Sequence, residues 1–321
     1  MDTHVTYVSQ ILDIPICKLY MLSNDTNTYG KHRKKNYYRN YHRVVLKKPQ
    51  SAKIRVLTVP NGFLKTVQRR ILNRILHQLP VSSYATAYQK GKSLRDNALP
   101  HVNKEMVVKL DIAQFFDHIN GDMVFGVMRQ LELSERATAL LTHLCIYQDK
   151  LPQGAPTSPY LANLVMRHFD ERIGAWCSER SIQYTRYCDD MTFSGTRDAI
   201  MQSHLISYVR KKLYFLGFSL NEQKTAIVSD AQQQRVTGIV VNDKAAIPRT
   251  LRRKLRQEVY YCCQYGVSES LRHRGDDTDP TAYLHRLIGR IAYAKQIDPT
   301  DQEMQNLFTR VLHLIREASE E

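Results

Sequence analysis

The 321-residue chain lacks the features of several protein classes. Its six cysteines include no Cys-x-x-Cys pair, which argues against a structural zinc site. We therefore expect reduced thiols and a cytoplasmic protein, with the adjacent Cys262 and Cys263 as small core residues of one helix. The N-terminus interrupts its apolar residues with Asp13, Pro15 and Lys18, which fits neither a secretory signal nor a membrane span.

Acidic residues are also scarce relative to basic ones, 31 against 46, for a formal charge of +15. Such an excess favours a polyanionic partner, nucleic acid before membrane. Residues 31–48 hold eight Lys or Arg and no acid, with tyrosines among them. Interleaved cations and aromatics suit a surface that follows phosphates and stacks on bases, although a solvated basic loop has the same composition.

Hydrophobic periodicity predicts a mixed core followed by a helical C-terminal third, an α+β architecture. Strands are expected at 53–59, 107–110 and 235–242, with a hairpin at 182–194. Helices are expected at 1–22, 63–79, 113–130, 134–148, 157–179, 197–216, 249–265, 280–296 and 301–318. No internal repeat interrupts this order.

Two consecutive acids, Asp189 and Asp190, fall in the turn of the expected hairpin. Adjacent carboxylates repel each other and are tolerated where water or a divalent cation screens them. Asp111 ends the apolar strand 107–110. If the two strands are neighbours, Asp111 and Asp189 converge and could hold two divalent metals about 3.5–4 Å apart for phosphoryl transfer. Oxygen-only ligands favour magnesium. Taken alone, each acid also fits an exposed surface carboxylate.

Several separate stretches then resemble, in order and at similar separations, the motifs of reverse transcriptases. Those like motifs A, B, C and D are Leu110-Asp111-Ile112-Ala113-Gln114-Phe115-Phe116, Leu151-Pro152-Gln153-Gly154-Ala155-Pro156-Thr157-Ser158-Pro159, Tyr187-Cys188-Asp189-Asp190 and Asn221-Glu222-Gln223-Lys224-Thr225. The resemblance covers about residues 50 to 260. In the family the third motif is most often Tyr-Ala-Asp-Asp. We expect Cys188 to be tolerated as a small hydrophobic residue and not to act as a nucleophile.

Two further stretches resemble retron reverse transcriptases. Asn97-Ala98-Leu99-Pro100-His101 is similar to their Asn-Ala-x-x-His element, and Val236-Thr237-Gly238 to their Val-Thr-Gly element. The size of the chain, with no maturase, integrase or RNase H segment appended, also fits that family. The plainer interpretation of the first stretch is a helix that ends at Pro100, with a capping Asn97 and a surface His101.

The resemblance implies roles for individual residues. The catalytic residues are Asp111, Asp189 and Asp190, and the site of two Mg²⁺ ions is formed by Asp111, Ile112, Asp189 and Asp190. The nucleotide-binding residues are Lys53, Arg55, Phe116, Gln153 and Lys224. Phe116 matches the steric gate that excludes a 2′-hydroxyl, and Gly154 lets the backbone approach the substrate. Lys224 matches a lysine that helps protonate pyrophosphate, although an exposed lysine at a helix end fits its position too.

The expected helix 249–265 has an apolar stripe and a basic surface. The stripe consists of Leu251, Leu255, Val259 and Cys262. Arg252, Arg253 and Arg256 lie elsewhere on the surface and are predicted to contact RNA. Such a helix can join a core on one side and meet phosphates on the other, as a polymerase thumb does.

The resemblance thus implies a retron-type RNA-directed DNA polymerase with a right-hand fold: an N-terminal extension at 1–45, fingers at 46–104, a palm at 105–242 and a helical thumb at 243–321. Its implied partners are deoxynucleoside triphosphates, a noncoding RNA that is both template and primer, the branched DNA product and an effector protein in phage defence. No membrane is expected. Two alternatives stay open: another bacterial reverse transcriptase lineage, and an RNA-binding scaffold that restrains an effector without polymerising. The three intact acids argue against the scaffold.

Overall fold

The computed structural model describes residues 2–25, 40–47 and 54–320. Lys53 and residues 31–39 and 48 of the basic stretch lie outside this part of the chain. The chain forms two compact units, and each is described by itself. The first unit consists of Met1–Lys92, Lys109–Met191 and Met201–Ala226, and the second of Ser93–Val108, Thr192–Ile200 and Ile227–Glu321.

The first unit begins with two short helices, α1 (Thr3–Leu12) and α2 (Ile16–Asp25), where one helical extension was expected. The break has a local cause. Asp13 adopts the left-handed conformation with φ 51°, and Pro15 lacks the N–H that a helix interior requires. Both helices contact α7 (Glu135–Cys145), so this extension belongs to the helical part of the first unit.

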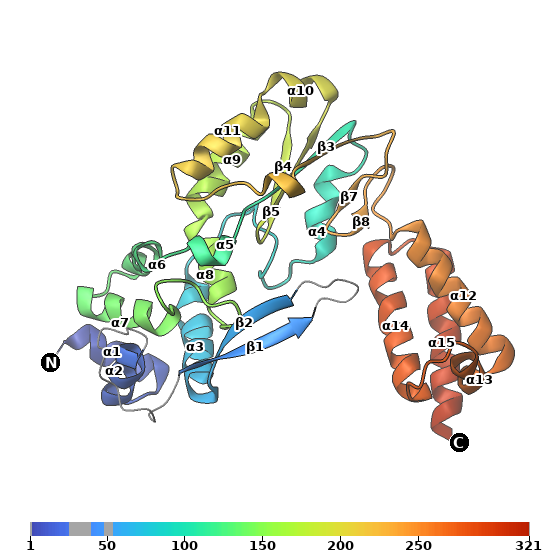
Figure 1. Cartoon of the computed structure of the whole chain (residues 1–321), viewed down its shortest axis with the longest axis horizontal. Helices are drawn as coiled ribbons and strands as arrows, with labels where there is room; N and C mark the ends of the chain where they lie inside the picture. The colour runs from blue at the N-terminus through green and yellow to red at the C-terminus, as the bar shows by residue number, and fades with distance from the viewer. Residues whose placement is uncertain (1, 26–39, 48–53, 321) are drawn as a thin grey trace. The chain divides into compact units, whose positions relative to one another are not determined.

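A two-stranded antiparallel hairpin follows, formed by β1 (Tyr41–Lys47) and β2 (Ile54–Pro60) (Figure 1). The strand expected at 53–59 is confirmed over its described residues. Asn61 then caps α3 (Gly62–Arg74) by accepting the Leu64 N–H at 2.9 Å. The expected helix over 63–79 ends at Arg74, and a 3₁₀ turn continues the segment.

A four-stranded sheet carries the acidic residues, with strand order β4-β5-β3-β6. Three of these strands, β3, β4 and β5, are labelled in Figure 1. Its strands are β3 (Met106–Asp111), β4 (Gln183–Tyr187), β5 (Asp190–Gly195) and β6 (Ala226–Ser229). β4 and β5 form the expected hairpin, and β5 is the neighbour of β3. The turn consists of Cys188 and Asp189, whereas Asp190, which was also expected in the turn, is the first residue of β5. β3 is buried at every position except Lys109, as its apolar sequence predicts. The strand containing Asp111 and the acidic turn are therefore neighbours in one sheet.

The remaining helices between β3 and β6 are shorter than their hydrophobic patterns predict. They are α5 (Phe115–His118), α6 (Gly121–Met128), α8 (Ser158–Val165), α9 (Arg167–Ser178), α10 (Arg197–Gln202) and α11 (Leu205–Tyr214). The expected helix over 197–216 breaks at His204, where φ is 50°. The expected helix over 113–130 is likewise split, because Asn120 caps a new helix by accepting the Met123 N–H. Each break redirects the chain without ending the apolar pattern.

The second unit is built on a helical core. Its elements are α4 (Leu94–Ala98), β7 (Arg235–Val236), β8 (Ile239–Val240), α12 (Arg249–Tyr265), α13 (Val267–His273), α14 (Pro280–Ile297) and α15 (Gln302–Glu320). The predicted stripe of α12 is confirmed, since Leu255, Val259 and Cys262 are buried and Leu251 packs against them. Cys263, expected in the core, is instead exposed.

The single strand expected over 235–242 is wrong. Thr237 and Gly238 have φ of 47° and 88°, so the chain reverses there and β7 pairs with β8 as a small antiparallel hairpin. Two consecutive left-handed residues are the geometry of a tight hairpin turn. The search for membrane spans, made over the described residues, finds no helix with the length and apolarity to cross a bilayer.

Candidate active site

The backbone fixes the two acidic segments against each other. Ile112 donates its N–H to the Asp189 carbonyl at 3.0 Å, and Asn221 donates its N–H to the Asp111 carbonyl at 2.8 Å. The end of β3 is therefore held on one side by the acidic turn and on the other by the segment that precedes Lys224. This confirms the expected adjacency of the two strands.

The side chains of this site form a charged cluster. Lys224 Nζ donates to Asp111 Oδ2 at 2.6 Å, and Asp111 is buried while the lysine side chain is 59% exposed. Asp111 accounts for most of the increase in the Lys224 pKa, and Asp189 and Asp190 add to it. The ammonium of Lys224 is therefore within electrostatic range of all three predicted catalytic acids.

Asp190 is the acid most affected by its neighbours. Loss of hydration, then the charges of Asp189 and Asp111, raise its pKa to about 6. A side-chain interaction with Asp111 adds to this increase. The repulsion among these carboxylates is the electrostatic condition that a bound cation relieves.

The oxygen donors of this cluster are suited to a divalent metal ion. Within the described ranges, no group of three or more His, Cys, Asp or Glu side chains is arranged as a metal site. The carboxylates of Asp111 and Asp190 nevertheless interact with each other. Asp111 also forms an ion pair with the ammonium of Lys224. All-oxygen donors and crowded negative charge fit a hard divalent ion.

The acidic turn has a strained backbone. Cys188 has φ 62°, a left-handed conformation that costs energy for any residue with a Cβ. Its thiol is buried, and burial raises its pKa to about 12, so the side chain is a neutral thiol at physiological pH. This agrees with the prediction of a small packing residue. The Tyr88 hydroxyl lies 3.5 Å from its sulfur.

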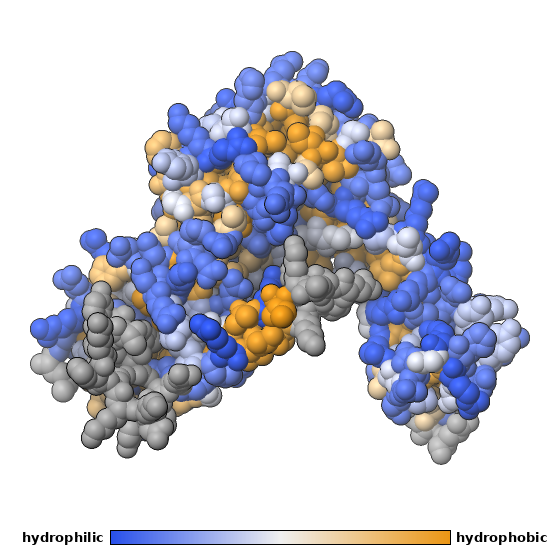
Figure 2. Space-filling view, in the orientation of Figure 1, coloured by the Kyte–Doolittle hydropathy of each residue, from blue (hydrophilic) through white to orange (hydrophobic). Residues whose placement is uncertain are grey.

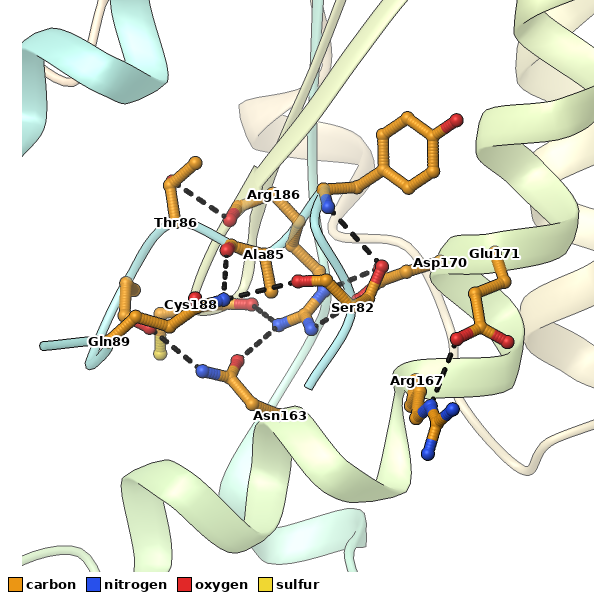
Figure 3. Close-up of polar contacts among 12 residues, drawn as sticks. Ser82, Ala85, Thr86, Gln89, Asn163, Arg167, Asp170, Glu171, Arg186 and Cys188 are labelled. Carbon is orange, nitrogen blue, oxygen red and sulfur yellow. Dashed lines mark hydrogen bonds and ion pairs between the residues drawn. The ribbon is translucent and has the colours of Figure 1, made fainter. Parts of the chain in front are cut away.

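Sequence reasoning missed a buried ion pair beneath this turn, shown in Figure 3. Arg186 and Asp170 both have fully buried side chains. The guanidinium donates from Nε to Asp170 Oδ1 at 2.8 Å and from Nη2 to Oδ2 at 2.5 Å. Arg186 Nη1 also donates to Asn163 Oδ1 and, at 2.9 Å, to the Cys188 carbonyl. The ion pair therefore connects helices α8 and α9 to the peptide that precedes Asp189.

The same network reaches the loop before α4. Thr86 donates its N–H to the Arg186 carbonyl at 2.8 Å, Arg186 donates its N–H to Tyr84, and Asn163 donates to the Ala87 carbonyl (Figure 3). One signal was available in the sequence. Arg186 lies in a short strand just before the acidic turn, and an arginine that is buried in such a strand needs a buried partner.

The motif B-like loop lies against the β1–β2 hairpin. The Gln153 carbonyl accepts the Thr58 N–H at 2.9 Å. Gly154 has φ 129°, and a Cβ there would lie 3.0 Å from the Thr58 carbonyl oxygen. The glycine was expected to permit approach to substrate. In the structure it permits approach to β2, which carries the predicted nucleotide-binding residue Arg55.

Two other predicted nucleotide-binding residues, Arg55 and Phe116, are accessible. Arg55 is exposed on β2. The neighbouring Val45, Ile54 and Val56 are between 49% and 61% exposed and contribute to the apolar surface of the hairpin in Figure 2. Phe116 is half-buried with its ring 5.5 Å from that of Phe115. Their contacts with nucleotide stay predictions, as does that of Lys53, which lies outside the described residues.

The two retron-like elements meet in the second unit. Asn97 Nδ2 lies 3.4 Å from Thr237 Oγ1, although the residues are 140 positions apart. Asn97 is buried inside α4, whose N-cap is Ser93 and whose C-cap is Leu99, so a capping Asn97 is wrong. His101 is fully buried with Nδ1 2.7 Å from Ser194 Oγ, so a surface His101 is wrong as well. Burial lowers the pKa of His101 to about 3 and keeps the ring neutral.

The position of the second element is different. Val236 is buried, Thr237 is half-buried and Gly238 is exposed at the tip of the β7–β8 hairpin. The buried residues therefore support a loop whose tip is open to solvent. A direct contact with RNA is available to Thr237 and Gly238, and not to His101 in this conformation.

The three arginines predicted to contact RNA differ in their surroundings. Arg252 forms ion pairs with Asp301 and Glu303 of the α15 segment, and Arg256 pairs with Glu303 at 2.5 Å. Arg253 is exposed and has no ion-pair partner among the residues that the structure describes. The ion pairs join α12 to α15, so RNA contact by Arg252 or Arg256 would compete with a structural role.

Comparison with known proteins identifies the family. The family model "Reverse transcriptase (RNA-dependent DNA polymerase)" matches residues 45–241. The chain is 32% identical over 241 residues to the retron Ec86 reverse transcriptase of Escherichia coli, covering 74% of this chain and 73% of that enzyme. It is 31% identical to the retron Mx65 reverse transcriptase of Myxococcus xanthus, with coverage of 86% and 65%. It is 30% identical to the retron Ec83 reverse transcriptase of Escherichia coli, with coverage of 76% and 79%.

Among solved structures, telomerase from Candida albicans aligns with a TM-score of 0.46 at 12% identity, covering 85% of this chain and 63% of that one. A likeness at that level says nothing about function. The sequence matches do: the chain belongs to the reverse transcriptases, and within them it is of the retron type. It is thus an RNA-directed DNA polymerase of right-hand fold, and this family depends on a divalent metal ion.

Proposed function

We propose that this polymerase uses one structured noncoding RNA as both template and primer. Synthesis would begin at the 2′-hydroxyl of a guanosine in that RNA and would leave a branched RNA–DNA product. The proposal includes two Mg²⁺ ions, the fingers, palm and thumb boundaries predicted from the sequence, an effector protein partner and a role in phage defence. The similarity to several retron enzymes supports it.

One structural observation carries the retron-specific part of this proposal. The Asn97 amide and the Thr237 hydroxyl bring two retron-like elements together that a generic polymerase core does not need. Their contact supports the exposed tip at Gly238. A supported loop tip with backbone groups open to solvent is suited to RNA, which is recognised through shape and backbone contacts.

The chemical roles follow from the residues of the cluster. Asp111, Asp189 and Asp190, with Ile112 beside them, would hold the metal ions, which would activate the attacking hydroxyl and stabilise the leaving pyrophosphate. Lys224 balances the charge of Asp111 and is placed to donate a proton nearby. Phe116 would restrict the sugar to a 2′-deoxyribose. Arg55 would bind phosphate oxygens through its guanidinium.

The test compares two reactions of the full chain. Coexpressed with the RNA encoded beside its gene, the chain should make a short single-stranded DNA that debranching enzyme shifts on a denaturing gel. Thr237→Val removes the hydroxyl that contacts Asn97 and should reduce this DNA by about tenfold or more, the loss expected for one interaction of about 1.4 kcal/mol. Extension of a primer annealed to a generic template should fall much less.

Two controls complete this experiment. Thr309→Val removes a hydroxyl on exposed α15 that bonds only locally, to the Gln305 carbonyl, and should change neither reaction. Asp189→Asn should abolish both reactions and leave RNA binding in a gel shift nearly intact. Equal losses in both reactions for Thr237→Val would assign the element to folding or catalysis. A DNA product that has neither a branch nor a 5′ end trimmed from one would contradict 2′-hydroxyl priming.

A further inference from the structure

A groove lies between α12 and α13 of the second unit, with a volume of about 670 Å³. This volume is typical of sites that bind small molecules or single nucleotides. One face of α12 supplies Lys254, Glu258, Tyr261 and Tyr265. Glu269 and His273 of α13 and Arg274, the residue after it, line the other side. The reverse transcriptase motifs do not include these residues.

One wall of the groove is aromatic. Tyr261 and Tyr265 are 39% and 58% exposed, and their rings are stacked with centroids 6.0 Å apart at 30°. Large aromatic side chains are normally buried in a core or an interface, so two exposed rings side by side indicate a binding surface. Flat exposed rings are the surface on which unpaired bases stack.

The floor of the groove is a buried carboxylate. Glu258 is 5% exposed, and its Oε2 accepts hydrogen bonds from the Tyr283 hydroxyl at 2.9 Å and from Arg290 at 2.7 Å. Its Oε1 forms an ion pair with Lys254 Nζ at 3.9 Å, which is too long for a hydrogen bond. Arg274 holds the Tyr283 hydroxyl at 2.9 Å. The carboxylate is thus fixed in place with one oxygen positioned to accept an N–H from a ligand.

The charged side chains of the groove are mixed in sign. α12 carries five Lys or Arg and one acid, and of these Lys254 and Glu258 line the groove. Lys254 and Glu269 are exposed there, and Glu269 forms an ion pair with Arg272. An exposed lysine beside aromatic rings suits a phosphate followed by a base. The N–H groups of a base edge match the one available carboxylate oxygen on the floor.

We propose that the groove between α12 and α13 binds one unpaired nucleotide of RNA, with the base stacked on Tyr261 and Tyr265 and its edge donating to Glu258. The phosphate lies near Lys254. This proposal rests on the proposed function, because the bound nucleotide belongs to the structured RNA that the enzyme is proposed to use. A duplex cannot enter, because its bases are already stacked and paired.

The test measures the dissociation constants of fluorescein-labelled RNA hairpins for the full chain. No deoxynucleoside triphosphates are added, so no DNA is synthesised during the measurement. Three hairpins share one stem: one is fully paired, one carries a single bulged adenosine and one carries an abasic bulge. We expect the bulged adenosine to bind about tenfold more tightly than the other two, as one stacked base provides. Equal dissociation constants for the three hairpins would overturn the proposal without any variant.

Variants locate the effect. Tyr265→Ala should remove the preference for the bulged adenosine, and Tyr265→Phe should keep it, because the ring remains. Tyr260→Ala is the matched control, since Tyr260 is 53% exposed on the same helix and does not line the groove. Thermal unfolding of each variant checks the fold. An equal loss in Tyr260→Ala and Tyr265→Ala would place the contact elsewhere on α12.

The two proposals can fail separately. A bulge preference that depends on Tyr265, in an enzyme that makes no branched DNA, would support the groove and contradict 2′-hydroxyl priming. Branched DNA from an enzyme that binds all three hairpins equally would contradict the groove alone.

Discussion

The Lys224 ammonium lies 2.6 Å from the Asp111 carboxylate and joins the motif D-like segment to the end of β3. Lys224 also lowers the pKa of Asp190, which other effects raise to about 6. Removal of this cation should therefore raise the pKa of Asp190 further.

Lys224→Gln should shift the acid limb of the pH profile for metal-dependent synthesis to higher pH. It should also reduce kcat about 100-fold, as the loss of a proton donor does. Lys224→Arg keeps the charge and should keep the pH profile, although its rate can fall. The measurement is kcat for primer extension from pH 5.5 to 8.5. A Lys224→Gln profile equal to that of the wild type would show that the ion pair does not tune the acids.

Asp190→Asn should stabilise the metal-free protein while it removes activity. The folded-state pKa of Asp190, about 6, is above its ordinary value of 3.8. This group therefore favours folding below pH 3.8, and that stability is lost as pH rises through 6. At pH 7.5 the neutral amide avoids the repulsion from Asp111 and Asp189. Thermal unfolding in a chelator should show a higher midpoint for the variant. Mg²⁺ should raise the midpoint of the wild type more than that of the variant.

Arg186→Met should destabilise the first unit by about 3 to 5 kcal/mol, because it leaves the Asp170 carboxylate buried without a cation. Arg186→Met combined with Asp170→Leu removes both charges and should recover much of that loss. Chemical unfolding measures both variants. If the double variant folds but synthesises DNA slowly, the Arg186 hydrogen bond to the Cys188 carbonyl positions the acidic turn. Full activity of the double variant would show that the Arg186–Asp170 ion pair contributes to stability and does not position the acidic turn.

Phe116→Val should admit ribonucleotides. A smaller side chain opens the space that the ring is predicted to fill beneath the sugar, and the half-buried position of Phe116 makes a large loss of stability unexpected. The measurement is the ratio of ribonucleotide to deoxyribonucleotide incorporation. Phe115→Val is not a usable control, because Phe115 is buried in the core. An unchanged ratio in an active Phe116→Val enzyme would mean that another residue is the gate.

The sequence alone determined the class of protein and predicted the three acids of the candidate site. Asp111 after a continuous apolar strand, and Asp189 and Asp190 between two short strands, are local patterns, and strand ends and hairpin turns are local structures. The stripe of α12 was equally visible, because burial of one helix face repeats every three to four residues. The helix breaks at Asp13 and His204 could not be predicted from the hydrophobic pattern, because a single left-handed residue leaves the apolar period intact on both sides.

Only the tertiary structure decided which groups share an environment. The Arg186–Asp170 pair, the contact of Asn97 with Thr237 and the ion pair of Lys224 with Asp111 join residues 16, 140 and 113 positions apart. Their partners depend on how strands and helices pack. Burial then determines the chemistry: it makes His101 a neutral support for a loop and not a surface contact, and it raises the pKa of Asp190. A sequence gives the residue types, whereas hydration and neighbouring charge are properties of the folded chain.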